Sequence, residues 1–274
     1  ILLLLFSLIF IFFFRYFFIL MNKYKKIFND SKFIVLNKFI KNINPIIEKT
    51  CFLKKNIVIW ENPQDDGGNL FVTNKKRRAY ILFLEENNLA DVLPVNLKEN
   101  KHNFPPFLRK RLESYKKCYN ELYPLLYNPI NTVLRILGYR RWAIVGITLF
   151  SISPGSPEQE IHHDAPEETK RIFITIPLHK TTLDMGPTVF YDDNKLKGFR
   201  DKYMNDEEGR SKRPYGNIGY LNELADIELF KNARCQFNHD IGDICIHRDI
   251  TWHSAGNNIS NKHREILFIV IDVM

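Results

Sequence analysis

Cysteine is scarce in this chain of 274 residues, which contains four, and no two of them are spaced as a Cys-x-x-Cys pair. The absence of such a pair argues against a zinc knuckle. Cys235 and Cys245 could face each other across neighbouring strands, but we expect buried free thiols and a reducing compartment.

Signals for nucleic-acid and calcium binding are also missing. The chain carries a net charge of +8, with basic clusters at 75–78 and 109–111, but no basic stripe is interleaved with aromatic residues. Nucleic acid is therefore not an expected partner. The clusters could face an anionic substrate or membrane surface, although a solvated face of a Lys- and Asn-rich chain is the preferred interpretation. Asp65 and Asp66 lack further acidic residues at calcium-loop spacing, which indicates a plain loop.

Charge is nearly absent from residues 1–20, where Arg15 is the one charged side chain. A helix of this length spans about 30 Å, enough to cross a bilayer, and the lysines that follow would keep the rest of the chain in the cytosol. The alternative is that 1–20 are untranslated or mark a fragment start, because Met21 follows directly. No small-residue cleavage pattern indicates a signal peptide. Both interpretations place the main part of the chain in the cytoplasm, with or without an anchor.

The length suits one large domain with an N-terminal extension. Residues 21–141 are expected to supply helices and strands that buttress a core at 142–274. Helices are expected at 107–123, ended or kinked by Pro124, at 129–137, ending at Gly138, and at 221–230. Strands are expected at 57–60, 143–153 and 171–178, whereas 79–84 could be strand or helix. The charged stretch 192–217 is expected to be a surface insertion near a pocket mouth, with a substrate lid as the less favoured interpretation.

The most informative segment is the pair His162-x-Asp164. In an extended strand, residues two apart point to the same side, so both side chains could reach one metal ion while His163 points away. His253 is the candidate for a third ligand, because its flanking sequences have the pattern of strands. Two imidazoles and one carboxylate on one face of a metal leave the opposite positions open. A second pair, His247-Arg248-Asp249, lies so close to His253 that we interpret it as the entry to the loop carrying that residue.

Arg264 opens the last apolar run of the chain and has the same strand parity as Ile266, Phe268 and Val270. A buried arginine requires an anionic partner, and its planar fork suits a carboxylate. Lys262 is the rival anchor for an anion, but it lies in a polar stretch that indicates a solvated turn. The sequence therefore predicts that Arg264 faces the metal-binding pocket.

Several motifs in order resemble the phytanoyl-CoA dioxygenase family of Fe(II)/2-oxoglutarate oxygenases. They are Gln159-x-x-His162-x-Asp164, Met185-Gly186-Pro187-Thr188, Gly242-Asp243, His253-Ser254-Ala255-Gly256-Asn257-Asn258 and Arg264. The resemblance implies a mainly β fold with flanking helices and a double-stranded β-helix core, a jelly roll of the cupin type. It also implies iron ligands at His162, Asp164 and His253, and cosubstrate binding by Arg264, Gln159 and Asn257. The chain departs from the family at 190–194, where a Ser-His segment is missing.

The activity that this resemblance implies is hydroxylation of a small or lipid-like organic molecule, with Fe(II) as cofactor, O₂ and 2-oxoglutarate consumed, and succinate and CO₂ released. Asp164 argues against the halogenating relatives, which lack that carboxylate. A non-catalytic jelly roll that binds or senses a metal is the second interpretation. A zinc hydrolase with the same ligands ranks last, because Arg264 has no place in it. Neither the substrate nor the oligomeric state follows from the sequence.

Overall fold

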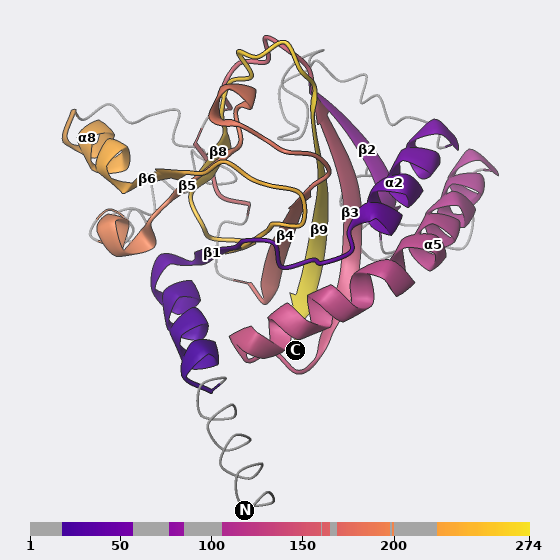
Figure 1. Cartoon of the computed structure of the whole chain (residues 1–274), viewed down its shortest axis with the longest axis horizontal. Helices are drawn as coiled ribbons and strands as arrows, with labels where there is room; N and C mark the ends of the chain where they lie inside the picture. The colour runs from indigo at the N-terminus through magenta and orange to yellow at the C-terminus, as the bar shows by residue number, and fades with distance from the viewer. Residues whose placement is uncertain are drawn as a thin grey trace, which may run out of the picture.

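The computed structural model describes residues 18–56, 77–84, 106–159, 161–164, 169–197, 199 and 224–274. Two antiparallel sheets form its centre. The larger has the strand order β1-β7-β4-β9-β3-β2 and the smaller the order β6-β5-β8. From β3 onward the chain crosses repeatedly between the sheets: β3 and β4 lie in the larger, β5 and β6 in the smaller, β7 in the larger, β8 in the smaller and β9 in the larger (Figure 1). The mainly β jelly roll with flanking helices is therefore confirmed.

The strands of the larger sheet are β1 (Phe33–Leu36), β2 (Arg77–Leu84), β3 (Trp142–Ile152), β4 (Arg171–Pro177), β7 (Ile244–Arg248) and β9 (Arg264–Val273). The smaller sheet consists of β5 (Thr188–Tyr191), β6 (Arg234–Gln236) and β8 (His253–Ala255). The strands expected at 143–153 and 171–178 correspond to β3 and β4, and 79–84 is strand, within β2. The sheet also contains β1, which pairs with β7 and which was not expected from the sequence pattern.

The larger sheet has one face toward the helices and one toward the smaller sheet. Buried isoleucines and leucines at alternate positions of β3, β4, β7 and β9 join the main core beneath α2 (Asn44–Asn56) and α5 (Pro106–Leu137). Figure 1 shows these two helices together on that side. The other parity of β9, from Arg264 through Ile266 to Phe268, lines an internal cavity instead. The predicted common face of these three residues is confirmed.

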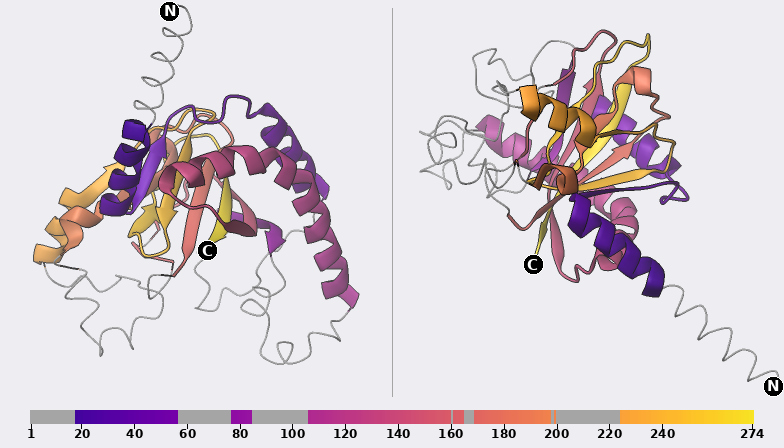
Figure 2. Two further views of the ribbon diagram at one scale, coloured as in Figure 1. Left: turned by 90° about the horizontal axis from the view of Figure 1, so that it is seen from below. Right: turned by 90° about the vertical axis from the view of Figure 1, so that its left-hand side faces the viewer.

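Helix α5 joins the two helices expected at 107–123 and 129–137 into one, so of the two effects expected of Pro124, an end or a kink, the end is wrong. It runs for 32 residues with Pro124 and Pro129 inside it, and Figure 2 shows its curved course. Each internal proline removes a backbone donor and costs about 3 kcal/mol. The fully buried side chains Leu122, Leu126 and Ile130 offset this cost, because burying each one contributes roughly 1.5–3 kcal/mol. The expected end at Gly138 is confirmed: Gly138 adopts φ 96°, and Tyr139 N–H donates to Leu134 O over 2.8 Å.

The outer face of the smaller sheet has a hydrophobic cluster of its own. Trp252, Phe230, Phe199 and Leu196 pack there against β5. Phe230 belongs to α8 (Leu224–Ala233), which corresponds to the helix expected at 221–230. The strand expected at 57–60, the loop at Asp65 and Asp66, and most of the insertion at 192–217 lie outside the described residues.

Residues 18–31 form a helix that precedes β1. None of the helices in the described part of the chain combines the length and apolarity that a membrane crossing needs. Most of the apolar run 1–20 lies outside that part, so the anchor remains a prediction. All four cysteines are free thiols, as expected; Cys118 and Cys245 are buried, and Cys51 and Cys235 partly so.

Candidate metal and cosubstrate site

Two segments far apart in the sequence meet through the backbones of His162 and His253. His162 N–H donates to His253 O over 2.9 Å, and His253 N–H returns a bond to His162 O over 2.8 Å. This isolated bridge adds the residue 162 segment to the edge of the smaller sheet beside β8. The two imidazole rings lie on the same side, with centroids 4.4 Å apart.

Asp164 completes a three-residue cluster with these histidines. One ligand atom from each of His162, Asp164 and His253 lies within 4.8 Å of the others. Asp164 Oδ2 and His253 Nε2 are 3.7 Å apart. Ligands about 2.1 Å from a metal at right angles are about 3 Å from each other, so a small closing movement would suffice. His163 turns the other way and packs edge-on against Trp252, with centroids 4.4 Å apart, as strand parity predicts.

The charge states of the cluster suit a metal cation. Burial lowers the pKa of His253 to about 4, so its imidazole is neutral at pH 7. The His253 Nδ1 faces Thr251 O at 2.9 Å. Because a carbonyl oxygen only accepts, Nδ1 carries the proton and Nε2 presents its lone pair to the cluster.

The carboxylate of Asp164 also fits a metal. Burial raises its pKa to about 6, opposed by His162 and assisted by Asp249, and it is still mostly ionised at pH 7. Its buried Oδ2 has no hydrogen-bond donor among the residues that the structure describes. A buried anionic oxygen without a donor is costly, and a cation would relieve that cost. Two imidazoles and one carboxylate form a facial set that suits Fe(II).

The side chain of Arg264 lies in the same cavity. The residue is 1% exposed although it carries a full positive charge. Lys262, the rival candidate, is exposed, and its carbonyl oxygen accepts a hydrogen bond from Asn258 Nδ2 over 2.8 Å. The preference for Arg264 over Lys262 as the pocket-facing cation is therefore supported by the geometry.

Gln159 and Asn257 occupy different positions. Gln159 lines the cavity and is held by Ala255: Gln159 N–H donates to Ala255 O over 2.8 Å, and Ala255 N–H donates to Gln159 Oε1 over 3.1 Å. Asn257 is exposed and does not line the cavity. The buried asparagine of this turn is Asn258, whose amide donates to Ile152 O and Lys262 O. Asn258 thus ties the turn after β8 to the end of β3 and the start of β9.

The cavity between the two sheets has an empty volume of about 690 Å³, including its part open to solvent. Its lining residues are Phe150, Ile152, Gln159, His162, Asp164, Thr175, Thr188, His247, His253, Ser254, Ala255, Arg264, Ile266 and Phe268. The side chains of His162, Asp164 and His253 thus face the same cavity as Arg264. Apolar side chains from β3 and β9 form much of the remaining wall.

Thr175 and His247 are lining residues that sequence reasoning missed. His247 is the penultimate residue of β7 and Asp249 begins the turn that leads to His253, so the pair lies at the entry to that turn, but the interpretation did not place the His247 side chain in the cavity. The signal that could have located it is parity, since Ile244 and Ile246 belong to the main core and residues 245 and 247 must then face inward.

Asp249 links the segment that carries His162 and Asp164 to the segment that carries His253. Its carbonyl oxygen accepts a hydrogen bond from Asp164 N–H over 2.9 Å. Its side chain is fully buried and accepts bonds from Thr169 N–H over 2.7 Å, from the Thr169 hydroxyl, and from Ile250 N–H over 2.9 Å. Asp249 therefore ties the turn that precedes His253 to the segment that carries His162 and Asp164.

Replacing Asp249 with asparagine should weaken Mn(II) binding about tenfold, because an amide nitrogen would face a donor from Thr169 or Ile250 and loosen the support of Asp164. Calorimetric titration would measure the change. Asp243→Asn is the matched control: Asp243 is equally buried and accepts from the backbone N–H of Lys38 and Asp240, each over 2.7 Å, but does not line the cavity. Equal losses of metal affinity in both variants would contradict a specific role for Asp249.

The close contact between the turns before β5 and after β8 explains the Gly186 of the Met-Gly-Pro-Thr motif. Gly186 adopts φ 66°, in the left-handed region, and a β-carbon there would collide with the backbone of Gly256 and Asn257. Only glycine meets both requirements. The motif thus holds Thr188 and Ala255 in register across the smaller sheet.

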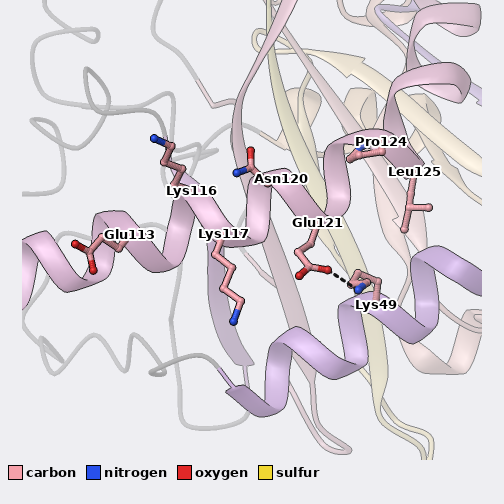
Figure 3. Close-up of a pocket in the computed structure, with 8 residues that line it drawn as sticks. All are labelled: Lys49, Glu113, Lys116, Lys117, Asn120, Glu121, Pro124 and Leu125. Atoms are coloured by element: carbon pink, nitrogen blue, oxygen red, sulfur yellow. Dashed lines mark hydrogen bonds and ion pairs between the residues drawn. The ribbon is translucent and has the colours of Figure 1, made fainter.

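A second hollow lies outside the barrel, between α2 and α5 (Figure 3). Glu121 of α5 points toward Lys49 of α2, and the two form an ion pair of 2.5 Å, while Lys116 points away from α2. Both partners of the pair are about one-third exposed, which makes this a helix-helix contact of modest strength. The diverging lysines do not converge on a ligand position.

The sequence matches no protein-family model and no curated protein. The fold, however, is similar to that of solved structures. The α-ketoglutarate-dependent epimerase SnoN from nogalamycin biosynthesis matches with a TM-score of 0.58 at 12% identity, over 92% of this chain and 82% of that protein. The α-ketoglutarate-dependent carbocyclase SnoK matches with a TM-score of 0.54 at 15% identity, over 90% and 82%. AviO1 from Streptomyces viridochromogenes matches with a TM-score of 0.51 at 11% identity, over 90% and 92%. At these identities the chain shares their fold, and its resemblance to the phytanoyl-CoA dioxygenase family remains a prediction.

Proposed function

We propose that this protein is an Fe(II)- and 2-oxoglutarate-dependent oxygenase that acts on a small organic molecule. The observation that carries the proposal is the presence of His162, Asp164, His253 and Arg264 around one buried cavity. A set of three metal-binding side chains alone would suit many functions. A buried guanidinium in the same cavity adds a site for a carboxylate, and a 2-oxo dicarboxylic acid could engage both.

Each residue has a distinct role in this proposal. His162, Asp164 and His253 hold the iron, and the reciprocal backbone bridge between the two histidines fixes their spacing. Arg264 binds the distal carboxylate of 2-oxoglutarate, while Gln159 supports the wall through its two bonds to Ala255. Ile266 and Phe268 form an apolar part of the cavity wall. We retain a cosubstrate role for Asn257 only as the prediction from the family resemblance, because the residue is exposed.

When Fe(II) is bound with 2-oxoglutarate and O₂, it supplies oxidation of a substrate C–H bond, coupled to conversion of the cosubstrate into succinate and CO₂. Hydroxylation is the outcome we favour. The solved proteins of similar fold include an epimerase and a carbocyclase, and SnoN has been crystallised with Fe³⁺, α-ketoglutarate and nogalamycin RO. They support a small-molecule substrate and illustrate outcomes besides hydroxylation. The proposal is independent of whether residues 1–20 anchor the chain to a membrane, with its catalytic part in the cytosol.

Oxygen-dependent succinate formation tests this function. The chain with Fe(II) and 2-oxoglutarate should form succinate in air but not under nitrogen, and mass spectrometry would quantify it. Adding small organic molecules should identify a substrate that accelerates the reaction and gains one oxygen atom. Binding of metal and 2-oxoglutarate without any oxygen-dependent succinate would instead favour a non-catalytic metal-binding or sensing protein, which the missing Ser-His segment at 190–194 motivates.

A further inference from the structure

His247 is a third imidazole in the cavity, in addition to those of His162 and His253. It is 1% exposed, and its strand register places it opposite Phe173 of β4 and Phe33 of β1. Its ring stacks on that of Phe173 with centroids 5.2 Å apart and an interplanar angle of 23°. The ring of His253 lies 4.8 Å away on another side. His247 is therefore held in place beside a residue that we assign as a metal ligand.

The hydrogen bond of His247 fixes which nitrogen carries the proton. Nδ1 lies 3.0 Å from Arg248 O, and because a carbonyl oxygen only accepts, Nδ1 must donate. The ring is buried and lies among the rings of Phe173, Phe190 and Phe268, surroundings that disfavour a charged imidazolium. Nε2, on the opposite edge of the ring, is then an acceptor directed away from the strand backbone. His253 has the same arrangement, with Nδ1 bonded to Thr251 O.

An acceptor in this position calls for a donor. His247 is not among the residues whose ligand atoms cluster within 4.8 Å, so a direct bond to the same metal does not fit the geometry. A carboxylate oxygen of the cosubstrate offers only lone pairs and would be repelled. Water on a divalent metal is a stronger donor than bulk water, because the cation withdraws electron density from it.

We propose that His247 is a positioning residue whose Nε2 accepts a hydrogen bond from a water molecule bound to the metal. This inference rests on the proposed function, since it requires a metal at His162, Asp164 and His253. It gives both residues of the second His-x-Asp pair a role in the site. Asp249 supports the segment of His162 and Asp164 from outside the cavity, and His247 lies in the cavity, on the side of the metal that the three ligands leave open.

Two substitutions at the same position separate hydrogen bonding from packing. His247→Asn retains a donor near the place of Nδ1 and removes the acceptor at Nε2, whereas His247→Gln returns an acceptor near Nε2. Mn(II) serves as the probe: calorimetry gives its affinity, and the longitudinal relaxation of water protons reports exchange of water on the bound ion. We expect His247→Asn to weaken Mn(II) binding about two- to tenfold, the range for one hydrogen bond, and to speed water exchange, with His247→Gln close to the wild type.

Two results would overturn the inference while leaving the proposed function intact. One is wild-type affinity and water exchange in both variants. The other is an equal loss in both variants, which would assign His247 a packing role. A wild-type chain that binds no Mn(II) would remove the proposed function and the inference together, and the wild-type titration distinguishes that case at once.

Discussion

Replacing His162 with alanine should strongly weaken metal binding and abolish iron-dependent succinate formation while leaving the fold intact. The loss of one of three protein ligands is expected to weaken Mn(II) binding by at least about 100-fold, beyond the effect of removing a supporting contact. The fold should persist because the bridge between residues 162 and 253 is made by backbone atoms, which the substitution does not change. Calorimetry, succinate assays and thermal unfolding would measure the three quantities.

His163→Ala is the matched control for this variant. The two histidines are adjacent, but the His163 ring packs on Trp252 in the cluster outside the smaller sheet. Its truncation should lower the melting temperature and leave metal affinity within a few-fold of the wild type. Undiminished metal binding by His162→Ala, or the loss of metal binding in His163→Ala alone, would contradict the assignment of His162, Asp164 and His253 as metal ligands.

Arg264→Ala should weaken 2-oxoglutarate binding by about 10²–10³-fold without a comparable change in Mn(II) affinity. The estimate follows from the loss of two charge-assisted hydrogen bonds, each worth about 1.5–3 kcal/mol, with part of the loss recovered by water entering the enlarged cavity. Arg264→Lys should restore part of the affinity, since an ammonium group supplies the charge but not the planar fork. Titration of 2-oxoglutarate into Mn(II)-loaded protein measures both effects.

Lys262→Ala is the control, because Lys262 lies two residues away, carries the same charge and is exposed. It should bind 2-oxoglutarate as the wild type does. If Lys262→Ala lost affinity and Arg264→Ala did not, the anchor would have to be assigned to the polar turn rather than to β9. Equal binding by all the variants would exclude a carboxylate site at either residue.

Strand parity predicted from sequence alone which side chains of the candidate site lie together. The two-residue spacing of His162 and Asp164 was sufficient to place both in one cluster and His163 outside it. The same rule brought Arg264 to the face of β9 that carries Ile266 and Phe268. These positions are predictable because side-chain direction in a strand is set by the local backbone and does not depend on distant contacts.

The predictions that the structure corrects concern features that depend on contacts between distant segments of the chain. α5 continues through Pro124 because its buried side chains are held by the sheet, and this packing is not visible in a local window. β1 is strand because it pairs with β7, from the other end of the chain. The place of the His247 side chain in the cavity was missed because it depends on the pairing of β7 with β4 and β1. Asn257 and Asn258 are adjacent, and only the turn geometry decides which is buried.

The absence of a matching family model beside a shared fold has a physical explanation. The proposed site would require few specific residues: three ligands, one arginine, and glycine where the turns at Gly186 and Gly256 touch. The remaining positions of the barrel require apolar side chains of suitable size on alternate strand positions, and many sequences meet that requirement. Identities of 10–15% to proteins with TM-scores of 0.54–0.58 are consistent with such weak constraints.

The most direct test of the central claim is the binding of 2-oxoglutarate to the full chain with and without Mn(II), measured anaerobically by calorimetry. His162, Asp164, His253 and Arg264 line one cavity, so we predict that one 2-oxoglutarate binds per chain and that its affinity depends on the metal. Succinate, which lacks the keto group, should bind more weakly. No binding at millimolar 2-oxoglutarate to a chain that has taken up Mn(II), or equal binding with and without the metal, would contradict it.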